Sequence, residues 1–155
     1  MSGASLRIRA AEPDDRDVLV EFARAMARET EDKALELGTL RAGVAALLAD
    51  PGRGRAFVAE ADGRVVASLM LTREWSEWRN GEFWWIQSVY VAPEHRRHGR
   101  YRRLHEHVRA LAASTPGVCG LRLYVETENR TAQHTYRSLG MAEQPYRIYE
   151  ELLRS

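Results

Sequence analysis

An arginine-rich turn between a predicted strand and a predicted helix is the part of this sequence best suited to bind an anion. The apolar residues Val89, Tyr90 and Val91 end the strand, and Arg96-Arg97-His98-Gly99-Arg100-Tyr101 leads into residues with helical periodicity. The first turn of a helix presents unpaired backbone N–H groups at the positive end of its dipole, and glycine lets the chain curl closely round a phosphate. Arginines add charge and forked hydrogen bonds. The segment therefore predicts a phosphate-binding turn.

A second polar segment follows the next apolar run. Asn129, Ala132 and Tyr136 are spaced so that they share one face of a helix, which Gly140 would end. A tyrosine there can donate a proton, or it can be a core aromatic with a satisfied hydroxyl. Asn129 can bind a ligand or cap the helix. The residues alone leave both pairs of alternatives open.

Both segments resemble the coenzyme-binding signatures of the GCN5-related N-acetyltransferase (GNAT) superfamily. Residues 96–101 follow Arg/Gln-x-x-Gly-x-Gly/Ala except at Tyr101, and residues 129–141 follow Asn-x-x-Ala-x-x-x-Tyr-x-x-x-Gly-Phe except at Met141. The resemblance implies that acetyl-CoA binds through its pyrophosphate and its pantetheine arm, and that Tyr136 acts as general acid toward the coenzyme sulfur. The coenzyme-binding residues that it implies are Val89, Tyr90, Val91, Arg96, Arg97, His98, Gly99, Arg100, Tyr101, Asn129, Ala132 and Tyr136.

The residues that would bind the amine or take its proton are predicted from the register of a hairpin. If Asn80-Gly81 forms a two-residue turn, Glu74 faces Gln87 beside the strand that would hold the thioester. Glu74 is therefore the candidate base or amine-binding residue, directly or through water. Glu29 is a second acidic candidate, because the resemblance implies that the segment after the first helix overhangs the acceptor site. Trp85 and Gln87 are predicted to line that site, although core packing and solvated surface would also account for these residues.

Composition bounds the class of protein. The chain has 155 residues, enough for one domain over residues 1–155, and its 23 basic and 22 acidic side chains leave a net charge of +1. That balance disfavours a general nucleic-acid binder. No apolar run reaches the roughly 18 residues of a membrane span. The start lacks a secretory pattern and the single cysteine, Cys119, can form no internal disulfide, so we expect a cytoplasmic location. We also expect no metal site.

Hydrophobic periodicity and turn residues predict an α/β (α+β) fold. The predicted strands are 6–10, 55–61, 64–73, 83–91, 118–125 and 146–149, and the predicted helices begin near 13, 40, 101 and 131. Asp62-Gly63 and Asn80-Gly81 suit hairpin turns, and strands 83–91 and 118–125 would be parallel. The resemblance implies the GNAT acyl-CoA N-acyltransferase fold, a mixed central sheet flanked by helices on both faces, in which those two strands diverge.

Together these features predict a bacterial N-acetyltransferase that moves an acetyl group from acetyl-CoA to a primary amine of a small molecule or peptide by direct transfer. Dimerisation is common in the family, so a homodimer is expected. The alternative is a non-catalytic module that senses acyl-CoA or binds a partner. A nucleic-acid-binding helix built on residues 96–103 is a third reading; its affinity would fall steeply with salt.

Overall fold

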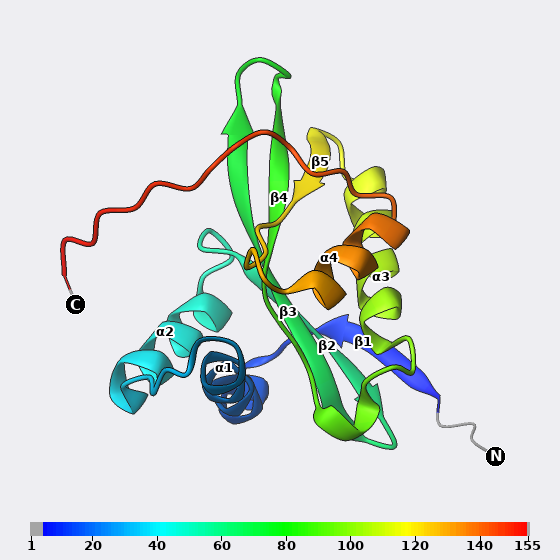
Figure 1. Ribbon diagram of the computed structural model, residues 1–155. Helices are drawn as coiled ribbons and strands as arrows, with labels where there is room; N and C mark the ends of the chain where they lie inside the picture. The colour runs from blue at the N-terminus through cyan, green and yellow to red at the C-terminus, as the bar shows by residue number, and fades with distance from the viewer. Residues whose placement is uncertain (1–4, 155) are drawn as a thin grey trace. The chain divides into compact units, whose positions relative to one another are not determined.

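The structure is a computed structural model that describes residues 5–154 (Figure 1). Residues 1–4, which belong to the start that lacks a secretory pattern, lie outside the described residues. The elements follow one another as β1 (Leu6–Ala10), α1 (Arg16–Glu31), α2 (Leu37–Ala49), β2 (Arg55–Ala61), β3 (Arg64–Ser76), β4 (Gly81–Val91), α3 (Arg100–Ser114), β5 (Val118–Arg122) and α4 (Arg130–Ser138). The chain divides into two compact units with the boundary after Tyr124. The first unit holds the sheet, and the second holds α4 and the segment that follows it.

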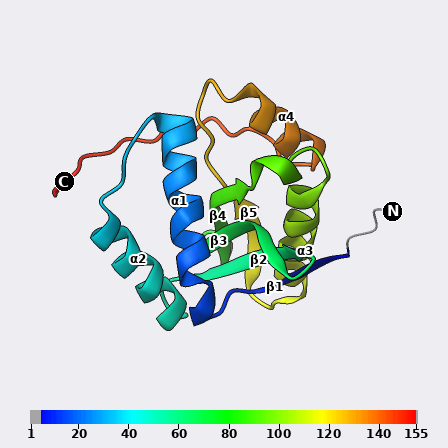
Figure 2. The same cartoon turned by 90° about the horizontal axis from the view of Figure 1, so that it is seen from below.

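The sheet of the first unit has the strand order β1-β2-β3-β4-β5. The first four strands pair antiparallel, and β5 pairs parallel with β4. Helices α1 and α2 lie on one side of the sheet and α3 on the other, as Figure 2 shows. The predicted mixed sheet with helices on both faces is therefore confirmed.

Two hydrophobic clusters hold these layers together. The larger cluster joins α3 to the sheet and includes the fully buried Leu104 and Val108 with Phe57 and Leu69. The smaller cluster packs α1 and α2 against the other face, around Val58. Because helices cover both faces, the central strands are apolar at consecutive positions rather than at alternate ones.

The two hairpin turns predicted from glycine dipeptides have different outcomes. Asp62 and Gly63 both have positive φ and close a two-residue turn between β2 and β3, as predicted. The prediction for Asn80-Gly81 was wrong, because β3 pairs as far as Ser76 and four residues connect it to β4. Gly81 is the first residue of β4. A Cβ there would lie 2.9 Å from the Gly117 carbonyl oxygen, so close backbone approach explains this glycine better than turn geometry.

A charged network ties the first strand to the start of α1. The guanidinium of Arg9 donates to both carboxylate oxygens of Asp15, at 2.8 and 2.9 Å, and to Glu60 on β2, at 2.8 and 3.1 Å. Asp15 is buried, and the hydrogen bond from Arg9 holds the pKa of its carboxyl below the usual range. The three side chains thus link the start of α1 to β1 and β2.

Two further departures from the sequence prediction concern the start of α2 and the segment after α4. Helix α2 begins three residues earlier, since the Glu36 carboxylate caps it by accepting from the N–H groups of Gly38 and Thr39. The closing strand predicted at residues 146–149 is absent: the described residues from 141 onward contain no helix or strand. Their apolar pattern suits a strand, but no described residue of this segment is in one.

Candidate functional site

The carboxyl half of β4 has an unpaired edge. Strand β5 pairs with β4 only from Glu82 to Trp85, and it ends at Arg122, three residues before the predicted end of that strand. Strand β4 continues to Val91. Along residues 86–91 no described strand pairs with the side of β4 that β5 pairs with earlier, so this part of β4 has an unpaired edge; the divergence of the two strands stays a prediction. Unpaired strand edges present N–H and C=O groups that bind extended, amide-containing ligands.

A bulge lies within this unpaired stretch. The register with β3 passes from Met70 opposite Gln87 to Ser68 opposite Tyr90, so β4 carries an extra residue, and Ser88 has a left-handed φ of 53°. A bulge bends its strand and redirects the residues beyond it. Val89 packs against the cluster under α3, whereas Tyr90 points to the α1 face. Nothing in the sequence around Ser88 signals this bulge, and sequence reasoning missed it.

The turn that follows β4 forms a backbone cradle. Arg97 has a φ of 66° and Gly99 a φ of 73°, and Gly99 is the N-cap of α3. Left-handed residues in a turn direct successive N–H groups toward one side, which makes an anion-binding concavity. No heavy atom lies within 4 Å of a Cβ built on Gly99, so the space above this turn is open.

Two arginines of this turn have hydrogen-bonding capacity to spare. Arg97 is exposed and makes no ion pair with a described residue. The Nε of Arg100 is buried without a hydrogen-bond partner among the described residues. A buried donor left unsatisfied costs stability, so such a group is expected to meet a ligand or water. An unpaired strand edge, an open cradle and an orphaned donor suit a ligand that carries amides and a diphosphate, as acetyl-CoA does.

Arg96 is used differently from the sequence expectation. Its Nε donates to the Val91 carbonyl at 2.8 Å, and its Nη2 donates to Glu29 at 2.7 Å. The guanidinium also lies 5.3 Å from the centroid of the Tyr90 ring. Arg96 therefore links the turn to the end of β4 and to α1, and its charge is already paired with the Glu29 carboxylate.

Glu29 links three elements of the site. It lies near the end of α1, and its second carboxylate oxygen accepts from the Tyr90 hydroxyl at 2.8 Å. The hydrogen bond from Arg96 is the main cause of a lowered pKa for the Glu29 carboxyl, and burial raises the pKa of the Tyr90 phenol. Tyr90 packs against Phe22, with ring centroids 4.9 Å apart. Glu29 is thus an ionised anchor between α1 and the turn, a contact that no sequence signal indicates.

Tyr101 occupies the place where the resembling signature has glycine or alanine. Its ring packs against the main core, and its hydroxyl lies 3.0 Å from Nδ1 of His105, one helical turn later. His105 is fully buried, and burial lowers its pKa to about 4, so the imidazole is neutral at pH 7. The bulky side chain at position 101 is accommodated in the interior and leaves the outer side of the turn open.

The predicted register of Glu74 was wrong, with consequences for its role. Glu74 lies opposite Phe83, not opposite Gln87. Six residues separate Phe83 from Val89, which is about 20 Å of extended chain, against about 7 Å in the predicted register. The four-residue loop of the hairpin is the physical reason for the shift. The Glu74 carboxylate is thus displaced far along the hairpin from residues 89–91.

Glu74 is also paired with other side chains. It accepts hydrogen bonds from Trp85 Nε1 at 2.8 Å and from Arg122 at 2.9 Å. The bond from Trp85 is the main cause of a lowered pKa for its carboxyl. Trp85 also lies beside Tyr124, and Gln87 donates to the Thr72 hydroxyl at 2.9 Å. These side chains form an aromatic and polar strip that leads from Glu74 toward the bulge.

The second unit carries the other predicted coenzyme segment. Asn129 caps α4, its Oδ1 accepting from the Ala132 N–H at 3.1 Å. The capping role left open by the sequence is therefore confirmed for Asn129. Tyr136 lies on α4 seven residues later, and burial raises the pKa of its phenol.

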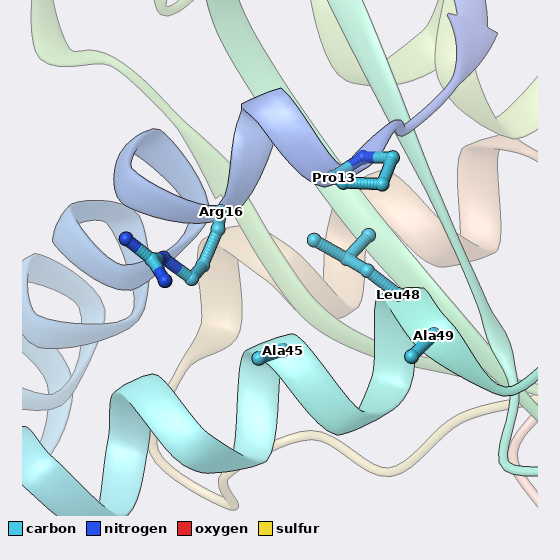
Figure 3. Close-up of a pocket in the computed structure, with 5 residues that line it drawn as sticks. All are labelled: Pro13, Arg16, Ala45, Leu48 and Ala49. Atoms are coloured by element: carbon cyan, nitrogen blue, oxygen red, sulfur yellow. The ribbon is translucent and has the colours of Figure 1, made fainter.

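Two cavities of the described residues lie outside residues 86–101. A shallow cavity of about 150 Å³ is lined by Pro13, Arg16, Ala45, Leu48 and Ala49, where the start of α1 meets the end of α2 (Figure 3). A second cavity, of about 200 Å³, involves Arg55, Arg73 and Trp84 among others. Neither is lined by residues 86–101. Residues 5–154 also include no group of three side chains placed to hold a metal ion and no helix long and apolar enough to cross a membrane.

Comparison with known proteins agrees with the geometry. The chain resembles the structure of a possible acetyltransferase from Clostridium difficile 630, with 43% identity, a TM-score of 0.90 and coverage of 97% of this chain and 99% of that one. It also resembles a GCN5-related N-acetyltransferase from Ralstonia eutropha JMP134 (25% identity, TM-score 0.78, coverage 95% and 99%). An aminoglycoside N-acetyltransferase, AAC(6')-Iy, in complex with CoA shares the fold at 17% identity, a TM-score of 0.78 and coverage of 99% and 98%.

No curated protein sequence matches significantly. The sequence model of the acetyltransferase (GNAT) family, however, matches residues 19–141, which include the unpaired edge of β4, the turn before α3 and the whole of α4. The chain therefore belongs to the GNAT family of acetyltransferases.

Proposed function

We propose that this protein transfers an acetyl group from acetyl-CoA to a primary amine of a small molecule or peptide, by direct transfer. The observation that carries the proposal is the unpaired edge of β4 at residues 86–91, which is followed, after a short 3-10 helix at Pro93–His95, by the open turn at Arg97 and Gly99. The edge offers strand-like hydrogen bonds to the amides of a pantetheine arm, and the turn offers N–H groups and charge to a pyrophosphate.

The binding roles follow from that layout. Backbone groups of Val89 and Val91 bind the pantetheine amides and polarise the thioester carbonyl, which acetyl-CoA supplies as the acyl donor. Arg97 and Arg100 provide the charge that faces the pyrophosphate, because Arg96 is already paired with Glu29. Tyr90, His98 and Tyr101 contribute main-chain atoms, while Asn129 and Ala132 border the coenzyme arm.

Tyr136 is the proposed general acid. The amine nitrogen attacks the thioester carbonyl carbon, the C–S bond breaks, and the departing thiolate takes the proton of the Tyr136 hydroxyl. Burial raises the pKa of this phenol, so it carries its proton at neutral pH, which the role requires. The proton lost by the amine passes to water.

Glu74 is proposed to attract the acceptor rather than to deprotonate it. A carboxylate with a lowered pKa, held by Trp85 and Arg122, is a weak base, and it lies far along β4 from Val89. Its charge and the indole of Trp85 suit a distal cationic group of an extended amine. Gln87 lies on β4 between Trp85 and the bulge at Ser88, and Glu29 borders the same face from α1.

Calorimetric titration with acetyl-CoA and desulfo-CoA, followed by thiol release with a panel of amines, tests the proposal. We expect micromolar binding of both and turnover with at least one amine. Tyr136→Phe should lower turnover about 100-fold at unchanged coenzyme affinity. Tyr146→Phe, an exposed tyrosine of the same unit, is the control. Binding without turnover on any amine would indicate the acyl-CoA-sensing alternative, and full activity of Tyr136→Phe would remove it as the acid.

A further inference from the structure

The cavity of about 200 Å³ lies on the face of the sheet that α3 covers, beyond the carboxyl end of that helix. Its wall includes Leu71 and Trp84, which belong to the core cluster under α3, and Thr115, which is the C-cap of α3. In Figure 1 the β3–β4 hairpin continues past this end of α3. The cavity therefore forms where the helix layer stops and the sheet continues, and its lining residues all belong to the first unit.

Strand pairing brings three charged side chains to this face. Arg55 on β2 pairs with Leu71 on β3, and Arg73 follows two residues later on β3. Because side chains alternate along a strand, the two arginines lie on the face of Leu71. Arg73 pairs with Trp84 on β4, and Glu82 precedes Trp84 by two residues. Glu82 therefore lies on the same face, and all three charged side chains line the cavity.

The charged groups of the cavity do not pair with one another. Among the described residues, neither Arg55 nor Arg73 forms an ion pair, and Arg73 donates to the backbone carbonyl of Gly52 at 3.2 Å. Glu82 has no ion pair with a described residue either, and one of its carboxylate oxygens accepts from the Trp84 indole N–H at 3.3 Å. Positive and negative side chains thus line one cavity with no nitrogen–oxygen contact within 4.0 Å between them. A ligand that carries both charges can pair with each of them.

We propose that this cavity binds a small molecule with the chemistry of an α-amino acid that has an apolar side chain. The carboxylate accepts forked hydrogen bonds from Arg55 and Arg73. The ammonium group donates to the carboxylate oxygen of Glu82 that Trp84 does not use, and the apolar side chain packs against Leu71 and the Trp84 indole. Glu82 disfavours a ligand that carries negative charge alone. The cavity is smaller than the roughly 300–1,000 Å³ of pockets for drug-sized ligands, so the ligand has on the order of ten non-hydrogen atoms.

The cavity and the predicted phosphate-binding turn lie at opposite ends of α3. Gly99 is the N-cap of this helix and Thr115 its C-cap. The helix has 15 residues, so its ends are roughly 20 Å apart at a rise of about 1.5 Å per residue. The proposal therefore does not rest on the acetyltransferase chemistry, and coenzyme and amino acid can be bound at the same time.

The tryptophan indoles provide a direct test, with L-phenylalanine as the probe. Trp84 Nε1 donates to Glu82 at the cavity, whereas Trp85 Nε1 donates to Glu74 on the opposite face of the sheet. Their N–H signals in a proton–nitrogen correlation spectrum are assigned with Trp84→Phe and Trp85→Phe. Titration should shift the Trp84 signal and leave the Trp85 signal in place, with a Kd on the order of 1 mM for a ligand of this size.

Related probes and variants separate the two charges of the ligand. The methyl ester of L-phenylalanine, which lacks the carboxylate, and N-acetyl-L-phenylalanine, which lacks the ammonium group, should each bind at least about tenfold more weakly. Arg55→Met and Arg73→Met, both at exposed positions, should raise the Kd of L-phenylalanine by a similar factor. Arg53→Met is the matched control, because Arg53 is exposed, pairs with Asp50 and does not line the cavity. Glu82→Gln should weaken binding of L-phenylalanine but not of N-acetyl-L-phenylalanine, a difference that a merely structural role would not produce.

Three results would overturn the proposal. The first is a Trp84 signal that stays in place up to about 20 mM L-phenylalanine, a concentration well above the expected Kd. The second is equal affinity for L-phenylalanine and its N-acetyl derivative, which would remove the role of Glu82. The third is loss of the Trp84 shift at saturating CoA, which would place the probe in the coenzyme site. If CoA does not bind at all, the acetyltransferase proposal fails while the expected Trp84 shift remains.

Discussion

Gly99 and Gly63 form a matched pair for testing the phosphate-binding turn. Their φ angles are 73° and 75°, and no heavy atom lies within 4 Å of a Cβ built on either. Gly99 is the N-cap of α3 beside Arg97, whereas Gly63 lies in the β2–β3 turn. Because backbone strain is the same at both positions, any difference in ligand binding between Gly99→Val and Gly63→Val comes from the turn at Gly99.

The magnitude follows from the backbone conformation. A side chain with a Cβ costs about 1–2 kcal/mol in the left-handed region, so both variants should lose roughly this much free energy of unfolding. At Gly99 the chain can relieve the strain only by rotating φ, which turns N–H groups away from the open side of the turn. Loss of one hydrogen bond to a charged group, worth about 1.5–3 kcal/mol, predicts a Kd for CoA at least about tenfold higher.

The assay is calorimetric titration of both variants with CoA and desulfo-CoA, combined with urea unfolding. We expect equal losses of unfolding free energy and a loss of affinity in Gly99→Val alone. The reasoning is refuted if Gly99→Val binds CoA within twofold of the unsubstituted chain while its stability falls as far as that of Gly63→Val. In that case the coenzyme does not use the turn.

Three further outcomes follow from the charged groups. Arg9→Met removes the main ion-pair partner of the largely buried carboxylates of Asp15 and Glu60 and should cost about 3 kcal/mol in urea unfolding. Arg7→Met removes only an exposed, 3.8 Å pair with Glu60 and should cost under about 0.5 kcal/mol. Burial lowers the pKa of His105 to about 4, whereas the usual value is about 6.5. Between about pH 4 and 6.5 the unfolded chain binds a proton at this histidine that the folded chain does not. The free energy of unfolding should therefore fall as the pH is lowered through this range, by at most about 1.4 kcal/mol per pH unit. His105→Phe should reduce this pH dependence of the free energy of unfolding, measured between pH 5 and 6.5. An unchanged pH dependence in this variant would mean that another group causes it. Glu29→Gln, by loosening Arg96, should weaken CoA binding a few-fold in calorimetry; unchanged affinity would make the contact purely structural.

The sequence predicts those parts of the fold that depend on local rules. Asp62-Gly63 supplies two left-handed residues, so its hairpin and register follow from two residues. Asn80-Gly81 carries the same signal, but Gly81 is needed for its approach to Gly117, a contact between segments distant in sequence. Side-chain period in a strand is two, so a longer loop carries Glu74 away from Gln87 without changing the apolar pattern. That ambiguity is why the register could not be read from the sequence.

The same distinction between local and long-range features applies to the candidate site. The turn at residues 96–101 is contiguous, and its glycine and arginines are evident in the sequence. The contacts of Glu29 with Tyr90 and Arg96 join residues more than sixty positions apart, so no local pattern reveals them. The bulge at Ser88 depends on how β3 and β4 pair, and no residue type in the sequence indicates it.

The distribution of the five arginines between residues 96 and 103 bears on what the turn can bind. Three of them make contacts within the protein: Arg96 with Glu29, Arg102 with an acidic side chain one turn later, and Arg103 with a backbone carbonyl of β1. Arg97 and Arg100 keep capacity for a ligand. A duplex or single strand of nucleic acid requires charge spread along a surface, with several phosphates neutralised. Two arginines beside an open, left-handed turn suit a single compact diphosphate, so the basic cluster that suggested a polyanion site in the sequence becomes, in the structure, an argument for a coenzyme.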